Sequence, residues 1–393
     1  RQPFCERRSG VGPDVVITPC GSYGHETVRA ALERALAPLG GLDWAGPGMR
    51  IAVKVNLVSG VEPEKAATTH PALLCALAEL LAERGAEVVV GDSPGGLYHA
   101  ALVNRAYAAA GLGAVERYGG RLNQDFTERE ASFPEGRVCR SFRYTGWLDG
   151  ADAVIDLCKL KTHGMMGMTC GAKNMFGAVP GTVKPEYHFH YPDTMDFARM
   201  IVDLDEYFKP RLTIVDAVEC MEGNGPGGGT PRHMGVVLAS DSPHKADLLC
   251  AKLIGLGPEG VPTLKAAAER GLIPASAEEL TVEGDAAAFA IPDFKLARAA
   301  AGHLFQGDGT SLRGRLKGAA IKRLLAQRPG LEGEKCVGCG KCREVCPADA
   351  IVMRGGKPRI HRKKCIRCFC CQEFCPKSAL VVRRTAAAKL LNR

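Results

Sequence analysis

The stretch Cys336-Val-Gly-Cys339-Gly-Lys-Cys342-Arg-Glu-Val-Cys346-Pro347 returns in the chain as Cys365-Ile-Arg-Cys368-Phe-Cys-Cys371-Gln-Glu-Phe-Cys375-Pro376. Each copy has the spacing C-x2-C-x2-C-x3-C-P. In this spacing three thiolates converge on one iron–sulfur cluster, and the fourth cysteine ligates the cluster of the other copy. We therefore predict that this part of the chain folds around two [4Fe-4S] clusters.

The exchange of the fourth ligand between the copies assigns every cysteine of the two motifs. The first cluster takes Cys336, Cys339, Cys342 and Cys375, and the second takes Cys365, Cys368, Cys371 and Cys346. Zinc ribbons use two C-x2-C pairs per metal, so zinc does not explain the third cysteine or the duplication. Cys370 stands between two ligands and is predicted to be a packed thiol.

This spacing is used by two-cluster bacterial ferredoxins. We therefore predict a small α+β ferredoxin-type two-cluster domain over residues 331–384, followed by a tail over residues 385–393. Residues 331–393 hold 15 Lys+Arg against 5 Asp+Glu, whereas residues 1–330 carry a formal charge of −2. A nucleic-acid partner is not expected, because no basic stretch is interleaved with aromatic residues. The basic charge instead suits the anionic clusters and an acidic redox partner, such as a ferredoxin, a flavodoxin or a reductase.

Composition bounds the rest of the chain. A length of 393 residues allows two or three domains, and 46% apolar with 24% charged residues excludes a disordered chain. No stretch is apolar enough for a membrane span. Residues 1–10 are charged and no apolar segment follows, so we expect no secretory signal and a cytoplasmic location. The sequence is compatible with a homodimer.

Residues 1–285 alternate between strand-like and helix-like patterns. The strand-like runs are Arg50–Val55, Ala86–Gly91, Ala151–Leu157, Arg211–Asp216 and Gly235–Ala239. The helix-like runs are Glu26–Ala37, Pro71–Arg84, Ala100–Ala110, Thr194–Phe208 and Pro243–Ile254. This alternation predicts a parallel-sheet-rich α/β substrate domain, because continuous apolar strands are typical of a sheet buried on both faces. Residues 286–330 are expected to form a helical connector to the cluster domain.

Polar residues follow the predicted strands, at the edge where open α/β sheets bind ligands. Lys54 is the last polar residue of the first strand, and Lys159 follows the third. The residues predicted to bind a small anionic substrate are Asn56, Asp92, Ser93, Lys159, Glu222 and Asn224.

The stretch from Lys159 to Lys184 combines basic residues with five glycines. Glycines permit close approach of the backbone to a ligand, and lysine and histidine supply cations and proton donors. The residues predicted to be catalytic are Lys161, His163, Lys173, Asn174 and Lys54. His188-Phe-His190 could bind a metal, but a structural role is the preferred interpretation. No organic cofactor is predicted.

Lys159-Leu-Lys-Thr-His163, Gly171-Ala-Lys-Asn-Met-Phe-Gly177 and Val215-Asp-Ala-Val-Glu-Cys-Met-Glu-Gly-Asn-Gly-Pro226 resemble signature blocks of domain-of-unknown-function family 362. The resemblance covers about residues 14–260, and members of that family often carry a two-cluster ferredoxin module at the C-terminus. It implies an α/β substrate domain joined to an electron-transfer module, with no generally established reaction. The segment Thr69-His-Pro71 with the helix and strand after it is also similar to the fold of nickel-pincer lactate racemase.

Three functional hypotheses follow. The first is an iron–sulfur oxidoreductase that passes electrons through two clusters to or from a small anionic substrate at the strand ends. The second is an electron carrier or assembly factor that uses the α/β domain as a docking platform. The third is a non-redox lyase or isomerase whose clusters are regulatory or structural.

Overall fold

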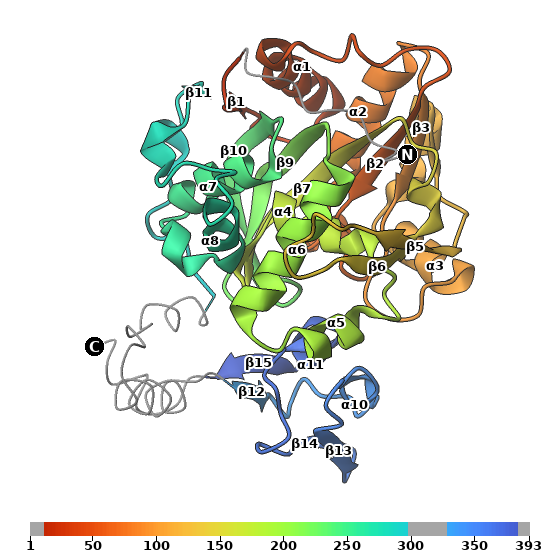
Figure 1. Cartoon of the computed structure of the whole chain (residues 1–393), viewed down its shortest axis with the longest axis vertical. Helices are drawn as coiled ribbons and strands as arrows, with labels where there is room; N and C mark the ends of the chain where they lie inside the picture. The colour runs from red at the N-terminus through yellow and green to blue at the C-terminus, as the bar shows by residue number, and fades with distance from the viewer. Residues whose placement is uncertain (1–11, 298–327, 384–393) are drawn as a thin grey trace.

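A nine-stranded, mostly parallel sheet forms the centre of the α/β domain (Figure 1). The computed structural model describes residues 12–297 and 328–383. The strands follow one another in the order β11-β1-β10-β9-β7-β2-β3-β4, and β8 pairs with the far end of β7. Their bounds are β1 Val15–Pro19, β2 Arg50–Val55, β3 Glu87–Gly91, β4 Gly120–Leu122, β7 Ala153–His163, β8 Gly167–Thr169, β9 Leu212–Glu222, β10 Thr230–Ser240 and β11 Val282–Glu283. A separate hairpin consists of β5 (Glu128–Ser132) and β6 (Ser141–Thr145).

The sheet confirms the predicted α/β class and contains all five predicted strands. The strands β4, β3, β2, β7 and β9 run parallel, but β10 is antiparallel to both β9 and β1. Two strands also extend beyond their predicted ends. Lys161–His163 pair with β8 and Glu219–Glu222 pair with β10, so residues expected in loops lie in strands. β7 and β9 are longer than predicted because an antiparallel neighbour pairs with the backbone N–H and C=O groups beyond the apolar run.

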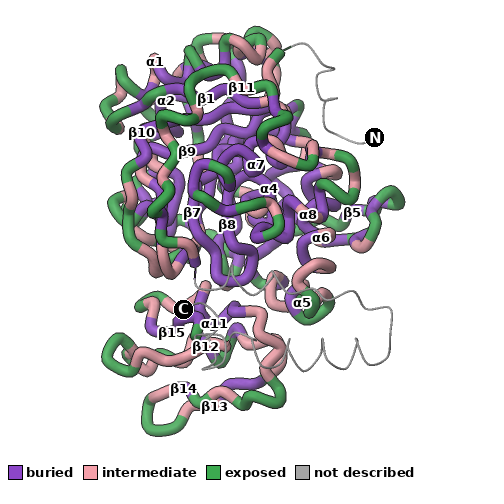
Figure 2. Tube along the Cα trace, turned by 90° about the vertical axis from the view of Figure 1, so that its left-hand side faces the viewer, coloured by how far each residue is buried: buried purple, intermediate pink, exposed green. Residues whose placement is uncertain are grey.

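Helices cover both faces of the sheet, and all five predicted helices are present. Their bounds, with three shorter helices, are α1 His25–Leu36, α2 Pro71–Ala82, α3 Ala100–Ala109, α4 Gly171–Asn174, α5 Lys184–His190, α6 Thr194–Phe208, α7 Pro243–Leu253 and α8 Pro262–Ala268. Successive strand residues face opposite layers. Val154 belongs to the core with α6 and α7, whereas Ile155 belongs to the core with α1 and α2. Figure 2 shows the resulting continuous buried sheet.

The described residues of the C-terminal module form two antiparallel strand pairs and two short helices. β12 (Arg328–Leu331) pairs with β15 (Leu380–Arg383), and β13 (Ile351–Arg354) pairs with β14 (Lys357–Ile360). The helices are α10 (Lys341–Glu344) and α11 (Cys370–Glu373). The two cysteine motifs share one backbone conformation. Positive φ angles occur at Gly338, Gly340 and Asp349 and at the matching positions Arg367, Phe369 and Ser378.

The module lies at one end of the α/β domain (Figures 1 and 2), where Glu373 of α11 contacts His163 of β7. Residues 298–327 of the predicted connector and the predicted tail lie outside the described residues. No helix among the residues that the structure describes is long and apolar enough to cross a membrane.

Candidate functional site

Cysteines of the two motifs lie close enough to affect each other's pKa values. Burial raises the pKa of the Cys342 thiol, and the nearby thiolates of Cys375 and Cys339 raise it further. Burial also raises the pKa of Cys365, with added contributions from Cys368 and Cys346. The fourth cysteine of each motif therefore lies with the other motif. This arrangement fits two clusters with exchanged ligands.

The sulfur atoms of the fourth cysteine in each motif accept equivalent backbone hydrogen bonds. The amide of Ala350 donates to Cys346 Sγ at 3.2 Å, and the amide of Ala379 donates to Cys375 Sγ at 3.3 Å. Within the described residues, no three His, Cys, Asp or Glu side chains converge closely enough to hold one metal ion. A cubane does not need such convergence on one point, because each thiolate binds a different iron.

A cavity of about 140 Å³ lies between the α/β domain and the module, and we call it the interdomain cavity. One ordered water needs a cavity of only about 10–15 Å³, so this cavity has room for a small metabolite. The α/β domain lines it with Asn56, Asp92, Ser93, His163, Lys173, Asn174, Lys184 and His188. The module lines it with Lys341, Glu373, Phe374 and Cys375.

Buried polar residues hold one wall of the interdomain cavity rigid. Lys54 Nζ lies 2.8 Å from Asp92 Oδ1 and donates to Asn174 Oδ1 at 3.1 Å. Asn56 Nδ2 donates to the same oxygen at 2.9 Å, and Asn174 Nδ2 donates to Asp156 Oδ1 at 2.6 Å. Burial raises the pKa of Asp156 to about 8. Because Lys54 is satisfied by these partners, it orients Asp92 and Asn174 and does not itself line the cavity.

His163 connects the two domains across the interdomain cavity. Its Nδ1 accepts from the amides of Met165 at 3.1 Å and Met166 at 3.2 Å, so the neutral ring carries its proton on Nε2. Nε2 lies 2.9 Å from Glu373 Oε1, a close contact that is too bent for a hydrogen bond. Burial lowers the pKa of His163. Burial alone would raise the pKa of Glu373, but His163 and Lys173 outweigh it and hold that pKa below its usual range.

Lys173 and Lys184 bring positive charge to the interdomain cavity. Lys173 Nζ lies 4.8 Å from the centre of the Phe176 ring, and within the described residues it has no ion pair or hydrogen bond. Burial lowers its pKa. Lys184 Nζ donates to the backbone oxygen of Ser93, and burial lowers the pKa of Lys184 to about 7. An ammonium group without a protein partner is a binding group for an anion.

His188 forms the wall beside these lysines. Its ring stacks on Phe197 at 4.3 Å, and only 2% of the residue is exposed. Burial lowers the pKa of His188 to about 3, so the ring is neutral at pH 7. The preferred sequence interpretation, a structural histidine, did not include this position in the site.

Two predicted residues lie away from the interdomain cavity on β7. Lys161 Nζ donates to Asn56 Oδ1 at 2.5 Å and to Ala67 O at 2.6 Å. Burial, with a smaller effect of the Lys159 charge, lowers the pKa of Lys161 to about 7. Lys161 therefore acts on the cavity only through Asn56.

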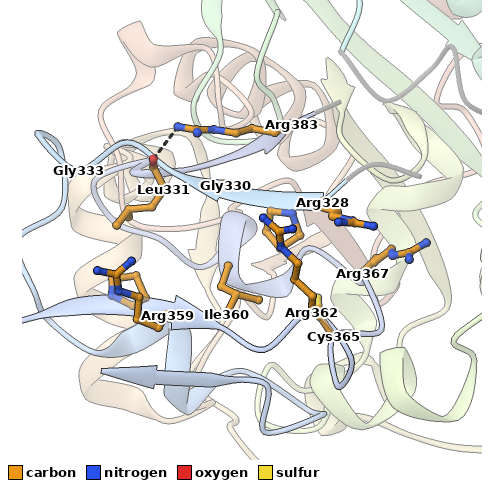
Figure 3. A pocket seen from close by; sticks show the side chains of 12 residues that line it. Arg328, Gly330, Leu331, Gly333, Arg359, Ile360, Arg362, Cys365, Arg367 and Arg383 are labelled. Atoms are coloured by element: carbon orange, nitrogen blue, oxygen red, sulfur yellow. Dashed lines mark hydrogen bonds between the residues drawn. The ribbon is translucent and has the colours of Figure 1, made fainter. Parts of the chain in front are cut away.

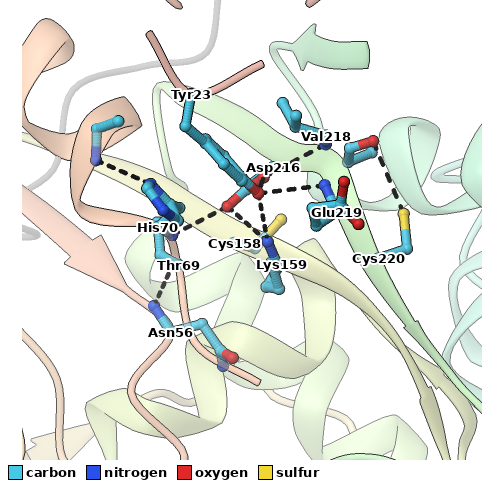
Figure 4. A network of polar contacts seen from close by, with 12 residues as sticks. Tyr23, Asn56, Thr69, His70, Cys158, Lys159, Asp216, Val218, Glu219 and Cys220 are labelled. Atoms are coloured by element: carbon cyan, nitrogen blue, oxygen red, sulfur yellow. Dashed lines mark hydrogen bonds and ion pairs between the residues drawn. The ribbon is translucent and has the colours of Figure 1, made fainter. Parts of the chain in front are cut away.

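Lys159 belongs to a second polar network, which Figure 4 shows with Asp216 at its centre. Lys159 Nζ lies 2.9 Å from Asp216 Oδ2 and donates to the Tyr23 hydroxyl at 2.8 Å. Tyr23 donates to Asp216 Oδ1 at 2.9 Å and stacks on His70 at 3.5 Å. Burial, followed by the charge of Asp216, raises the pKa of Tyr23. Lys159 is thus fully paired and does not line the interdomain cavity.

Of the last two predicted residues, Asn224 lies at the boundary between the two domains and Glu222 is the last residue of β9. Asn224 Oδ1 accepts from Gln372 Nε2 at 2.9 Å, so Asn224 helps to hold the module. Glu222 faces Lys295, with Oε1 3.1 Å from its Nζ. Sequence reasoning placed neither Glu373 nor Lys341 in the site, because only the docking of the module brings them there.

Two family models match separate parts of the chain. Residues 51–252 match the family model described as a domain of unknown function, DUF362. Residues 328–376 match the model of a 4Fe-4S dicluster domain, which indicates that the module binds a 4Fe-4S cluster. A thylakoid-associated protein of Synechocystis is 35% identical over 264 residues, which cover 65% of this chain and 79% of that protein.

Two solved structures share weak similarity with the chain. The lactate racemase apoprotein from Thermoanaerobacterium thermosaccharolyticum aligns with a TM-score of 0.38 and 12% identity, over 63% of this chain and 57% of its own. A Thermotoga maritima protein from a structural genomics programme aligns with a TM-score of 0.32 and 14% identity, over 50% of this chain and 51% of its own. The chain thus spans just over half the length of each.

Proposed function

This chain belongs to the DUF362 family, and because that name assigns no reaction, we propose a function from the chain's own site. We propose that the protein is an iron–sulfur oxidoreductase that passes electrons to or from a small anionic substrate in the interdomain cavity. One observation carries the proposal. The cavity is lined both by Cys375, a cluster ligand by its spacing, and by the unpaired ammonium group of Lys173.

Two [4Fe-4S] clusters are part of the proposal, held by the two cysteine groups named above. When bound, they supply single electrons. The chain's own residues do the remaining work. Lys173 binds the anionic group of the substrate, and Phe176 beneath it keeps the ammonium group in place by a cation–π contact. Asn174 and Asp92 also line the cavity and are held by their contacts with Lys54.

Lys184 is suited to deliver a proton. Its pKa of about 7 means that the charged and neutral forms are both populated at neutral pH, as proton transfer requires. Its ammonium group donates to the Ser93 carbonyl, and both residues line the cavity. His163 Nε2 faces the Glu373 carboxylate at 2.9 Å, a contact that joins the two domains beside the cavity.

The test uses anaerobically purified holoprotein whose clusters have been reduced with methyl viologen radical. The reduced protein is mixed with a panel of small carboxylates, 2-oxo acids and phosphate esters, and reoxidation is followed by the visible absorbance of the clusters. We expect one class of anion to reoxidise the wild type and the Lys65→Gln control, whose lysine is exposed and outside the cavity. Lys173→Gln should retain its clusters but lose this reaction.

Other outcomes distinguish the alternative functions. If no anion of the panel reoxidises the clusters, the oxidoreductase proposal fails and an electron carrier is favoured. If a metabolite is converted while the clusters stay reduced, the protein is a lyase or isomerase. Equal reoxidation of wild type and Lys173→Gln would place the substrate elsewhere.

A further inference from the structure

Five arginines line a groove of about 820 Å³ on the module, and we call it the arginine groove (Figure 3). They are Arg328, Arg359, Arg362, Arg367 and Arg383. Arg328 and Arg383 come from the paired strands β12 and β15, and the other three approach from β14 and the second cysteine loop. The Arg383 guanidinium donates to the Leu331 carbonyl at 2.7 Å, whereas Arg359 and Arg362 are exposed.

Within the module, no carboxylate neutralises the groove. The groove lining contains no Asp or Glu. The ion pairs that the described residues of the module form among themselves join Lys335 to Glu332 and Lys341 to Glu344. Five like charges around one hollow repel one another, so this surface is stabilised by an anionic partner.

The two segments that flank the groove residues in sequence do not supply that anion. Residues 298–327, which precede Arg328, contain six Lys+Arg and one Asp. Residues 384–393, which follow Arg383, contain three Lys+Arg and no acidic residue. Neither flanking segment therefore brings a net negative charge to the groove.

The arginine groove and the interdomain cavity border different cluster ligands. Cys365 lines the groove, and Cys375 lines the cavity. By the ligand grouping above, these two cysteines belong to different clusters. The module thus presents one cluster ligand to each of two separate hollows, an arrangement that suits entry of electrons at one and exit at the other.

We propose that the arginine groove is the docking surface for a small electron-transfer protein with an acidic rim around its redox centre. This inference rests on the proposed oxidoreductase function and names its partner. Arginine suits such an interface because its guanidinium group is weakly hydrated and pairs carboxylates in a bidentate manner. In the complex, the partner loses one electron and the cluster bound by Cys365 gains it, with no bond made or broken.

The test measures binding of an acidic bacterial flavodoxin to the anaerobic, full-length holoprotein by isothermal titration at several salt concentrations. The variant Arg359→Glu/Arg362→Glu reverses two exposed charges of the groove. Arg354→Glu is the matched control, because Arg354 is exposed on the same module but does not line the groove. We expect the double variant to lose about tenfold or more in affinity and most of its salt dependence, because rim charges act mainly through long-range attraction.

A second readout is the rate at which the clusters are reduced by flavodoxin or by methyl viologen radical. The double variant should be slow only with flavodoxin. The proposal is overturned if the double variant binds flavodoxin as tightly as the wild type, or if Arg354→Glu weakens binding equally. It is also overturned if single-stranded DNA or anionic vesicles bind the groove while flavodoxin does not. Because viologen bypasses the groove, failure of anion-driven reoxidation refutes the proposed function alone.

Discussion

Replacing Gly95 with alanine should displace the module from the α/β domain. A Cβ at Gly95 would lie 2.3 Å from one carbon of the Phe374 ring and 2.7 Å from two others. Ordinary contact begins at 3.4 Å, so the ring must move by more than about 1 Å. Phe374 stands between Glu373 and Cys375, and both line the interdomain cavity. Overpacking of this kind costs about 1–3 kcal/mol.

Hydrogen exchange of the amides of residues 370–376 measures this displacement. A loss of about 1–3 kcal/mol in local stability corresponds to exchange that is about 5- to 150-fold faster. Gly227→Ala is the matched control, because Gly227 also lies beside the module but a Cβ there meets no atom within 4 Å. Gly95→Ala should speed exchange in this segment and leave the central strands unchanged. Equal exchange in the two variants would refute the docking of Phe374 on Gly95.

Three further predictions concern the site itself. Lys173→Gln should weaken binding of oxalate, measured by isothermal titration, by about 10- to 100-fold, because it removes a charge-assisted bond; unchanged affinity would contradict this role. Lys184 is charged below its pKa of about 7 and neutral above it, so oxalate affinity should fall as pH rises through 7. In Lys184→Arg that fall should disappear, and its persistence would assign the titration to another group. Cys375→Ser should lose about four of eight irons, whereas Cys370→Ser, which changes a non-ligand thiol, should keep all of them.

Local patterns predicted much of the molecule. The cysteine spacing identified the module because cluster ligands lie a few residues apart in sequence. Apolar runs located β2 and β3 to within one residue of their observed ends. The direction of β10 could not be predicted, because it depends on which distant strand becomes its neighbour.

The candidate site was predicted only in part, for a geometric reason. Asn56 and Lys173 line the interdomain cavity, but Lys161 on β7 donates to Asn56 instead. Which neighbour a strand residue meets depends on register, and no local signal encodes it. Glu373 approaches His163 from the other domain, so only the docked structure reveals their contact. The catalytic and substrate-binding roles stay predictions.

The central claim is that an anion binds beside Lys173 in a cavity bordered by a cluster. The most direct measurement is the anomalous scattering of iron and bromide in crystals of the anaerobic holoprotein grown with bromide. The account predicts an iron cluster bound to Cys375 and a bromide ion within hydrogen-bonding distance of Lys173 Nζ. A cavity without bromide, or iron bound away from Cys375, would contradict it.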